Sequence, residues 1–380
     1  MQMELLGSHE LAHVFANIND PADMARVRAV CREWRGAMSP PHIDGKQMAD
    51  VLRLAPNEIL DAACRAGSLN LAKYAVLRGA TNFNTGLRSA CYGGYKEIVL
   101  LMISRGAIDV GSGLFNACKG GHKEIAELMI SRGATCTNRG LDSACRGGHK
   151  EIVLLMISHG ANNFNGGLNG ACRRGHKELA ELMCELGATN FDDGLFNACL
   201  GDHTEIAELM ISHGITNFNG GLYGACYSGN VKLVELMIKH GASNFDGGLY
   251  AACHGGHTKL VKLMCELGAT DFNYGLIGAC CGGHKELAEL MIRQGTNDFN
   301  GGLYRACKGG HKELAELMIR HGATDFNGGL DNACWGGHKE IVELVIRHGA
   351  NDFNKGLRKA RLMKHNEVAE LMISHGAVVS

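Results

Sequence analysis

Cysteine and histidine recur together through most of this 380-residue chain, with three residues between them each time. Thiolate and imidazole are good zinc ligands, so this spacing raises the question of a metal site. A tetrahedral structural site also needs a second ligand pair, and the sequence contains no paired-knuckle spacing that would supply one. We therefore predict that these residues are framework and that the chain binds no metal or cofactor. Examples of the pairs are Cys118/His122, Cys145/His149, Cys172/His176 and Cys253/His257.

The cysteines are also poor candidates for catalysis. A cysteine nucleophile requires an accessible thiol of lowered pKa beside a base. Eleven cysteines, from Cys64 to Cys334, follow one another at intervals of 27 residues, and a position filled identically eleven times is no active site. Glycine pairs such as Gly220-Gly221 precede a predicted helix, but the Lys-Ser/Thr of a phosphate-binding loop does not follow. We expect no enzymatic activity.

The 27-residue interval indicates the elements that position these side chains. Aligning the chain on the repeat cysteine, the one that recurs at this interval, gives twelve repeats. Each has Leu four residues before the cysteine, Ala one before it and Gly fifteen after it, and Arg361 replaces the cysteine in the twelfth. Such a strict period predicts a solenoid. Because stacked helices need a small residue where they approach closely, we expect the repeat cysteines to be buried, reduced thiols.

Each repeat reads as two helices joined by a glycine turn. An Asn or Asp such as Asn165 or Asp192 is the predicted N-cap of a first helix of about two turns. The helix carries Leu and Ala-Cys, and a glycine such as Gly121 is its predicted C-cap. A second helix of the type HKEIAELMISRGA follows, with apolar residues at helical spacing. In nine repeats a Phe precedes the predicted N-cap, for example Phe164, and is predicted to act as a hydrophobic staple.

This order of helix, Gly turn, Gly-His, longer helix and Gly-Ala resembles the ankyrin repeat over residues 57–380. The segment GLFNACKGGHKEIAELMISRGAT carries the match, although the repeats are six residues shorter than ankyrin repeats and lack Thr-Pro-Leu-His. The resemblance implies an all-α solenoid of twelve shortened ankyrin-like helix–turn–helix repeats without projecting fingers. Compact repeats of this kind look most like the ankyrin families multiplied in giant DNA viruses of amoebae, which would place the protein in the host cytoplasm or nucleus.

Composition limits the class of partner. The chain has 38 basic and 39 acidic residues, so its net charge of −1 predicts no strong electrostatic attraction to nucleic acid or to an anionic membrane. No apolar run is long enough to span a membrane, and the N-terminus lacks the pattern of a signal peptide. We expect a soluble, cytoplasmic monomer whose partners are proteins.

Residues that vary between repeats indicate where a partner would bind. The positions three before and one after the repeat cysteine lie four apart and share one face of the first helix, which lines the concave groove in ankyrin proteins. Their character is basic in repeats three to five and mostly aromatic in repeats six to eleven, and Tyr, Trp and Arg dominate interface hot spots. The alternative is that large residues at the earlier position pack on the Phe staple. The candidate groove residues are Tyr92, Lys119, Arg146, Arg173, Tyr223, Tyr227, Tyr250, His254, Tyr304, Lys308 and Trp335.

Residues 1–40 do not follow the repeat, and they resemble an F-box. The match includes the ending Val30-Cys31-x-x-Trp34-Arg35, while Gly7 replaces the usual Pro and one extra residue precedes Pro21. The resemblance implies a helical module that packs an apolar face on the Skp adaptor of a cullin–RING ligase; the alternative is a plain N-terminal cap of the solenoid. Residues 41–56 read as a linker and connecting helix, and residues 354–380 as a C-terminal cap. The expected F-box face consists of Leu6, Leu11, Val14, Phe15, Ile18, Met24, Val27, Val30, Cys31 and Trp34.

These observations predict a protein-interaction adaptor. The F-box-like module would recruit the Skp adaptor of an SCF-type ubiquitin ligase, and the groove would hold a target protein for ubiquitination. The rival hypothesis is an ankyrin scaffold or decoy that sequesters a host protein without any coupling to a ligase.

Overall fold

A computed structural model describes residues 55–378 of the chain. Every regular element in this part of the chain is an α-helix, and 24 helices form repeating helix–turn–helix pairs. Each pair corresponds to one 27-residue repeat, so the predicted all-α solenoid is confirmed. The F-box-like segment 1–40, and residues 41–54 of the connecting segment, lie outside the described residues.

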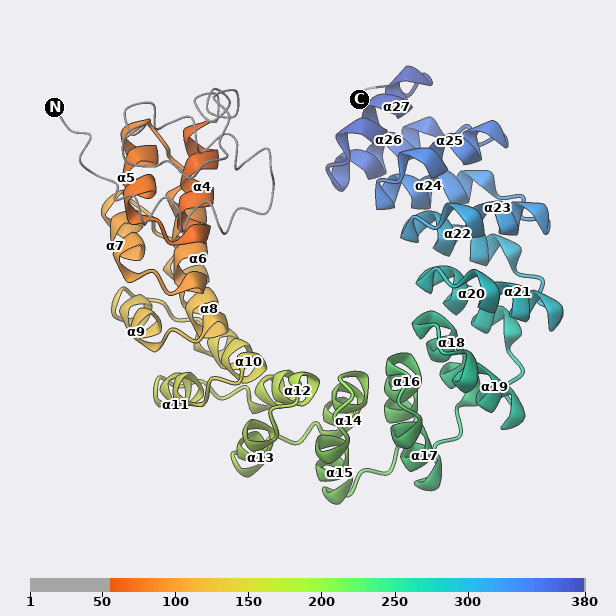
Figure 1. Ribbon diagram of the computed structural model, residues 1–380, viewed down its shortest axis with the longest axis horizontal. Coiled ribbons are helices and arrows are strands. Elements are labelled where there is room, and N and C mark those ends of the chain that lie inside the picture. Colours follow the sequence, from red (N-terminus) through yellow and green to blue (C-terminus); the bar gives the residue numbers. More distant parts are fainter. Residues whose placement is uncertain (1–54, 379–380) are drawn as a thin grey trace, which may run out of the picture. The chain divides into compact units, whose positions relative to one another are not determined.

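The helix pairs divide into two compact halves between Thr189 and Asn190, and each half is described by itself. In the first half the first helices of successive repeats lie side by side in one row and the second helices lie in another (Figure 1). The first helices are α4 (Pro56–Ala66), α6 (Phe83–Gly93), α8 (Val110–Gly120), α10 (Thr137–Gly147) and α12 (Phe164–Arg174). The second helices are α5 (Leu69–Leu77), α7 (Lys96–Ser104), α9 (Lys123–Ser131), α11 (Lys150–Ser158) and α13 (Lys177–Glu185).

The second half repeats this arrangement with seven further helix pairs. Its first helices are α14 (Phe191–Leu200), α16 (Asn219–Ser228), α18 (Phe245–Gly255), α20 (Phe272–Gly282), α22 (Phe299–Gly309), α24 (Phe326–Gly336) and α26 (Phe353–Leu362). Its second helices are α15 (Thr204–Ser212), α17 (Val231–Lys239), α19 (Thr258–Glu266), α21 (Lys285–Arg293), α23 (Lys312–Arg320), α25 (Lys339–Arg347) and α27 (Asn366–Ser374).

The joints between repeats lie mainly between first helices. Within each half, neighbouring first helices pack along much of their length, whereas neighbouring second helices touch only sparsely. The reason is the small side chains of the first helices. In α16, Cys226 is fully buried, and its Sγ lies 3.8 Å from the Sδ of Met264 in the next repeat. A Cβ placed on Gly248 of α18 would come within 3.4 Å of that Sγ and 2.6 Å of that Sδ. Cysteine, glycine and methionine from three helices therefore fill one space.

The prediction for the repeat cysteines is confirmed. All eleven are free and fully buried. Burial raises the pKa of each of these thiols to about 12. A thiol with such a pKa stays protonated at neutral pH and is a poor nucleophile or metal ligand. The repeat cysteine is therefore a small apolar residue of the joint.

The first helix begins earlier than predicted: in α12 the N-cap is Asn163 rather than Asn165, a difference of about half a turn. In most repeats that have the Phe, the residue before it is the N-cap and the Phe is the first helical residue; in α16 Phe218 is itself the N-cap. Most first helices have 11 residues and about three turns. For example, Asn163 caps α12 by accepting a hydrogen bond from the backbone N–H of Gly166 at 3.1 Å. The predicted C-cap is confirmed, because Gly121 adopts the left-handed conformation with φ 85°.

The Asn or Asp after the Phe has a different role from the predicted cap. In α18 the carboxylate of Asp246 accepts hydrogen bonds from the backbone N–H groups of Thr270 and Asp271, at 2.7 and 2.8 Å. These residues begin the next repeat, so the side chain ties two repeats together. The side-chain oxygens of Asn219 and Asn300 likewise each accept two backbone N–H hydrogen bonds from the loop that begins the next repeat. The Asn or Asp that directly follows the Phe therefore stabilises the packing of one repeat on the next.

Membrane-spanning helices and metal-binding clusters are both absent from residues 55–378. None of the helices described is both long enough and apolar enough to cross a membrane. Within the same residues, no three Cys, His, Asp or Glu side chains gather in a way that would hold a metal ion.

Candidate interaction surface

Three columns of side chains make up one surface of the first helices. We number each position by its distance from the repeat cysteine and define the first-helix face as slots −6, −3 and +1. Residues three or four apart lie on the same side of a helix, so these slots stand one above another. The sequence indicated slots −3 and +1, and the structure adds slot −6.

Slot −3 of one repeat contacts slot −6 of the next repeat. The rings of Tyr250 and Tyr274 stack with their centroids 4.3 Å apart and an interplanar angle of 22°. The guanidinium carbon of Arg139 lies 5.1 Å from the centroid of the Phe115 ring. Successive first helices therefore present one connected surface within each half.

Slot +1 contacts slot +1 of the next repeat. The Tyr227 and His254 rings meet edge to face at 5.0 Å. The backbone beneath this column is held by the histidine of the Gly-His turn. The Nε2 of His257 hydrogen bonds to the carbonyl oxygen of Tyr227 at 3.0 Å, and that of His284 to the carbonyl oxygen of His254 at 3.1 Å. The recurring histidines are thus framework residues, as predicted, and they position the slot +1 residues.

In the first half the face is basic. The ammonium group of Lys119 lies 5.5 Å from the centroid of the Tyr92 ring, and the Tyr92 side chain is 52 % exposed. Arg146 is exposed and forms an ion pair with Asp142 at 3.4 Å, and Arg173 is half-buried in the same column. The structure thus brings Tyr92 and Lys119 together and places Arg146 and Arg173 further along the column.

In the second half an aromatic series runs along the face from α14 to α20. The Phe196 and Tyr223 rings lie 6.1 Å apart, as do those of Tyr223 and Tyr250. His254 also meets the Tyr250 ring at 5.8 Å. Burial raises the pKa of Tyr250 to about 12, and the nearby Cys281 and tyrosines add to this effect. Burial lowers the pKa of His254, with a further contribution from His284, so the imidazole is neutral at neutral pH.

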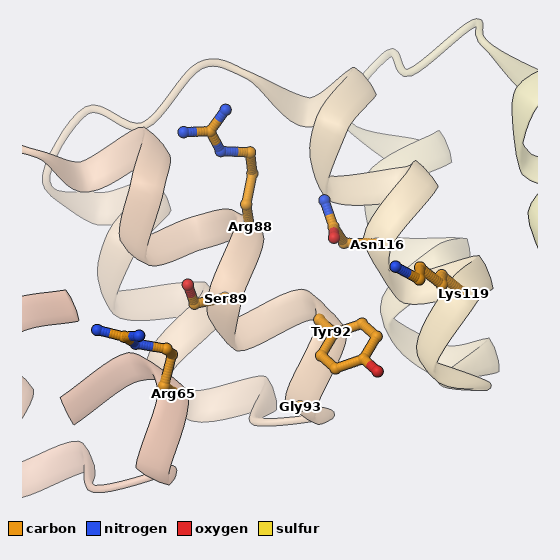
Figure 2. Close-up of a pocket in the computed structure, with 7 residues that line it drawn as sticks. All are labelled: Arg65, Arg88, Ser89, Tyr92, Gly93, Asn116 and Lys119. Atoms are coloured by element: carbon orange, nitrogen blue, oxygen red, sulfur yellow. The ribbon is translucent and has the colours of Figure 1, made fainter. Parts of the chain in front are cut away.

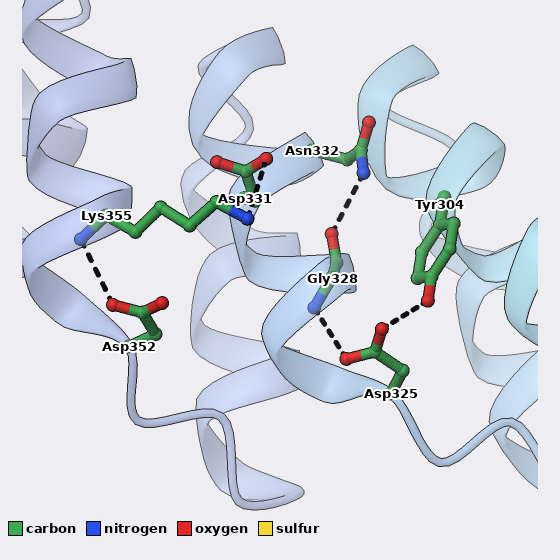
Figure 3. Close-up of polar contacts among 7 residues, drawn as sticks. All are labelled: Tyr304, Asp325, Gly328, Asp331, Asn332, Asp352 and Lys355. Atoms are coloured by element: carbon green, nitrogen blue, oxygen red, sulfur yellow. Dashed lines mark hydrogen bonds and ion pairs between the residues drawn. The ribbon is translucent and has the colours of Figure 1, made fainter.

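Polar contacts continue the face beyond the aromatic series. The Tyr304 hydroxyl donates a hydrogen bond to the carboxylate of Asp325, which is the N-cap of α24 and accepts the Gly328 N–H at 2.8 Å (Figure 3). Burial and this bond raise the pKa of Tyr304 to about 12, and the same bond lowers the pKa of Asp325. In the next repeat the Lys355 ammonium group lies 3.5 Å from the Asp331 carboxylate.

Trp335 lies between two lysines. The Nζ of Lys308 is 5.4 Å from the centroid of the Trp335 ring, and the Nζ of Lys359 is 4.8 Å away. Cation–π contacts at such distances contribute about 0.5–1 kcal/mol at exposed sites. Trp335 is only partly buried, so one part of the indole remains accessible.

The alternative interpretation, packing on the Phe staple, does not match the observed ring contacts. Several Phe residues that begin first helices contact the ring of a histidine 22 residues later, in stacked or tilted arrangements. Examples are the pair Phe191 and His213, with centroids 4.3 Å apart, and the pair Phe326 and His348 at 5.6 Å. The aromatic residues of slot −3 contact other residues of the face instead. The predicted F-box face (Leu6, Leu11, Val14, Phe15, Ile18, Met24, Val27, Val30, Cys31 and Trp34) lies outside the described residues.

Slot −6 was not among the positions predicted from the sequence. Tyr274, which is 39 % exposed, stands where several repeats have Gly and extends the aromatic series. Arg139 and Lys355 occupy the same slot and contact Phe115 and Asp331. The sequence could have indicated this slot, because it lies three residues before slot −3 and the two positions therefore share one helix face.

Comparisons with known proteins give one family match and similar solved structures. Residues 276–356, a stretch as long as three 27-residue repeats, match the family model for ankyrin repeats in three copies. The crystal structure of the human ASB11 ankyrin repeat domain is similar at 22 % sequence identity and a TM-score of 0.35, covering 41 % of this chain and 83 % of that domain. No curated protein is similar in sequence to this chain. The described part of the chain is thus an all-helical solenoid, and its residues 276–356 match ankyrin repeats.

Proposed function

We propose that this chain is a protein-interaction adaptor whose first-helix face binds a target protein. The observation that carries the proposal is the connected row of aromatic and cationic side chains on that face. Framework residues fix the backbone beneath it, while the face itself differs from repeat to repeat. Tyrosine and tryptophan offer large contact areas with few rotatable bonds, so they suit an interface.

The target-binding proposal can be tested with matched double variants of the second half. Tyr227→Ala/Trp335→Ala removes two aromatic rings from the first-helix face. Val231→Ala/Ile373→Ala is the control, because both residues are 42 % exposed and lie on second helices. We expect the first variant to capture its partner proteins from amoebal lysate at least about tenfold less efficiently than wild type, since hot-spot residues contribute 2 kcal/mol or more each.

The control should capture the same proteins as wild type. Hydrogen exchange of the second half shows whether the fold is intact in both variants, and we expect a loss of local stability below about 1.5 kcal/mol for each. Equal capture by both variants, with the fold intact, would contradict target binding through this face.

The coupling to a ubiquitin ligase is supported by the F-box resemblance of residues 1–40 alone. In this proposal the segment binds the Skp adaptor, and the solenoid raises the local concentration of target beside the ligase. A direct test measures binding of purified Skp adaptor to the full chain. Trp34→Ala and Val14→Asp should each abolish binding, whereas Trp335→Ala, the same type of truncation on the solenoid, should leave it unchanged. If wild type captures a target but does not bind the adaptor, the scaffold or decoy function is correct.

A further inference from the structure

The first half of the first-helix face is cationic although the whole chain is nearly neutral. The net charge of the chain is −1. Slots −6, −3 and +1 of repeats one to five hold six cations and three acids, so positive charge is concentrated on this surface. The cations are Arg65, Arg88, Lys119, Arg139, Arg146 and Arg173, and the acids are Glu58, Asp61 and Asp142.

A pocket of about 550 Å³ opens within this basic surface. Its walls come from three successive first helices: Arg65 belongs to α4, Arg88 and Tyr92 to α6, and Lys119 to α8 (Figure 2). Ser89, Gly93 and Asn116 complete the lining, which contains no carboxylate. The side chains that line the pocket are therefore mostly hydrogen-bond donors beside one aromatic wall.

Two of the three cations have no acidic partner in the part of the chain that is described. Arg65 forms an ion pair with Asp61 at 2.6 Å. Among the described residues, the Arg88 guanidinium donates a hydrogen bond to the hydroxyl of Thr85, at 3.2 Å, and the Lys119 ammonium group lies over the Tyr92 ring. Their charges remain available to an anion that enters between α6 and α8.

We propose that this pocket binds an anionic side chain, a carboxylate or a phosphorylated residue, of the protein held by the first-helix face. The inference rests on the proposed function and specifies the chemistry of the partner. Arg88 would form charge-assisted hydrogen bonds to the anion, Lys119 would supply a second charge, and the Tyr92 ring would pack against the adjoining stem. A polyanion such as nucleic acid fits less well, because Asp61 and Asp142 interrupt the basic surface on the two sides of the pocket.

Fluorescence anisotropy with labelled twelve-residue peptides tests the proposal on the full chain. One peptide carries central Asp-Glu residues, the second phosphoserines at the same positions, and the third Asn-Gln. We expect at least one anionic peptide to bind wild type about tenfold more tightly than the neutral peptide, because hydrogen bonds to charged groups contribute about 1.5–3 kcal/mol. The tighter anionic peptide identifies whether carboxylate or phosphate is preferred.

Arg88→Gln/Lys119→Gln should remove this preference, and Arg88→Lys/Lys119→Arg should keep most of it. Arg105→Gln/Arg132→Gln is the matched control, since it removes two exposed charges from the ends of α7 and α9 in the same half. The control should bind like wild type. Equal affinity of wild type for the neutral and both anionic peptides, or an equal loss in the control, overturns the inference. Target capture that depends on Tyr227 and Trp335 would survive that result, so the two proposals fail separately.

Discussion

Leu249→Ala is expected to destabilise the second half by about 3–5 kcal/mol. Leu249 is fully buried in α18, and its Cδ2 would lie 3.3 Å from a Cβ placed on Gly275 of α20. Truncating the leucine opens a cavity at the joint between the two helices. The residue across that joint is a glycine, which has no side chain to move into the cavity. The loss of folding stability should therefore lie near the upper end of the range for Leu→Ala substitutions.

Unfolding of a repeat array need not be two-state, so the measurement should report on local stability. Hydrogen exchange of α18 to α21 in the full chain is suitable. Leu267→Ala is the control, because this leucine follows α19 and is 36 % exposed; we expect it to cost less than about 1 kcal/mol. Similar losses of protection in the two variants would contradict the proposed role of Leu249.

A double-mutant cycle sharpens this test. Gly275→Ala alone should destabilise the joint by about 1–3 kcal/mol, because its Cβ would come within 2.6 Å of the Met291 Sδ and 3.3 Å of Leu249. In the Leu249→Ala background the contact with the leucine disappears. We therefore expect the double variant to be more stable than the sum of the single effects by at least about 0.5 kcal/mol. Additive effects would show that the two residues do not share the cavity.

The regular part of the fold could be predicted because each repeat contains its own local signals. The glycine after the repeat cysteine and the apolar spacing of the second helix act within a few residues. The start of the first helix could not be predicted in the same way. Asn163 and Asn165 flank Phe164, and both residue types suit an N-cap. Only the structure shows that Asn165 is not the cap. Its side-chain oxygen accepts a hydrogen bond from the backbone N–H of Thr189, in the loop 24 residues later.

The candidate surface was predictable where variation is visible against a uniform background. Slots −3 and +1 differ from repeat to repeat and so stood out in the sequence. Slot −6 is Gly in several repeats, so the sequence did not indicate a surface role for it. Tyr274 becomes part of the face only because α18 and α20 approach closely enough for its ring to reach Tyr250. Contacts between repeats thus decide which variable residues form one surface.

Glycine at slot −2 controls how closely two first helices approach. Gly224 and Gly278 occupy this slot in α16 and α20, and the pairs α14/α16 and α18/α20 are the most extensively packed first helices of the second half. A Cβ on Gly278 would lie 2.5 Å from the Tyr250 carbonyl oxygen and 3.3 Å from the Cys253 Cβ. The carbonyl is part of a helix backbone, so the clash can be relieved only by moving the two helices apart.

We therefore expect Gly278→Ala to destabilise the second half by about 2 kcal/mol, after a gain of about 0.5–1 kcal/mol from replacing a helical glycine. The same movement should weaken the Tyr250–Tyr274 stack and change the near-UV circular dichroism of the tyrosines. Gly220→Ala in α16 is the matched control. Its Cβ would meet only the Phe196 Cβ, at 3.9 Å, so this variant should be neutral or slightly stabilised. A stable Gly278→Ala protein with an unchanged tyrosine spectrum would show that close helix approach does not build the aromatic face. Opposite signs for the two changes in stability, together with an altered tyrosine spectrum in Gly278→Ala alone, would show that the spacing of the first helices sets the geometry of the aromatic residues.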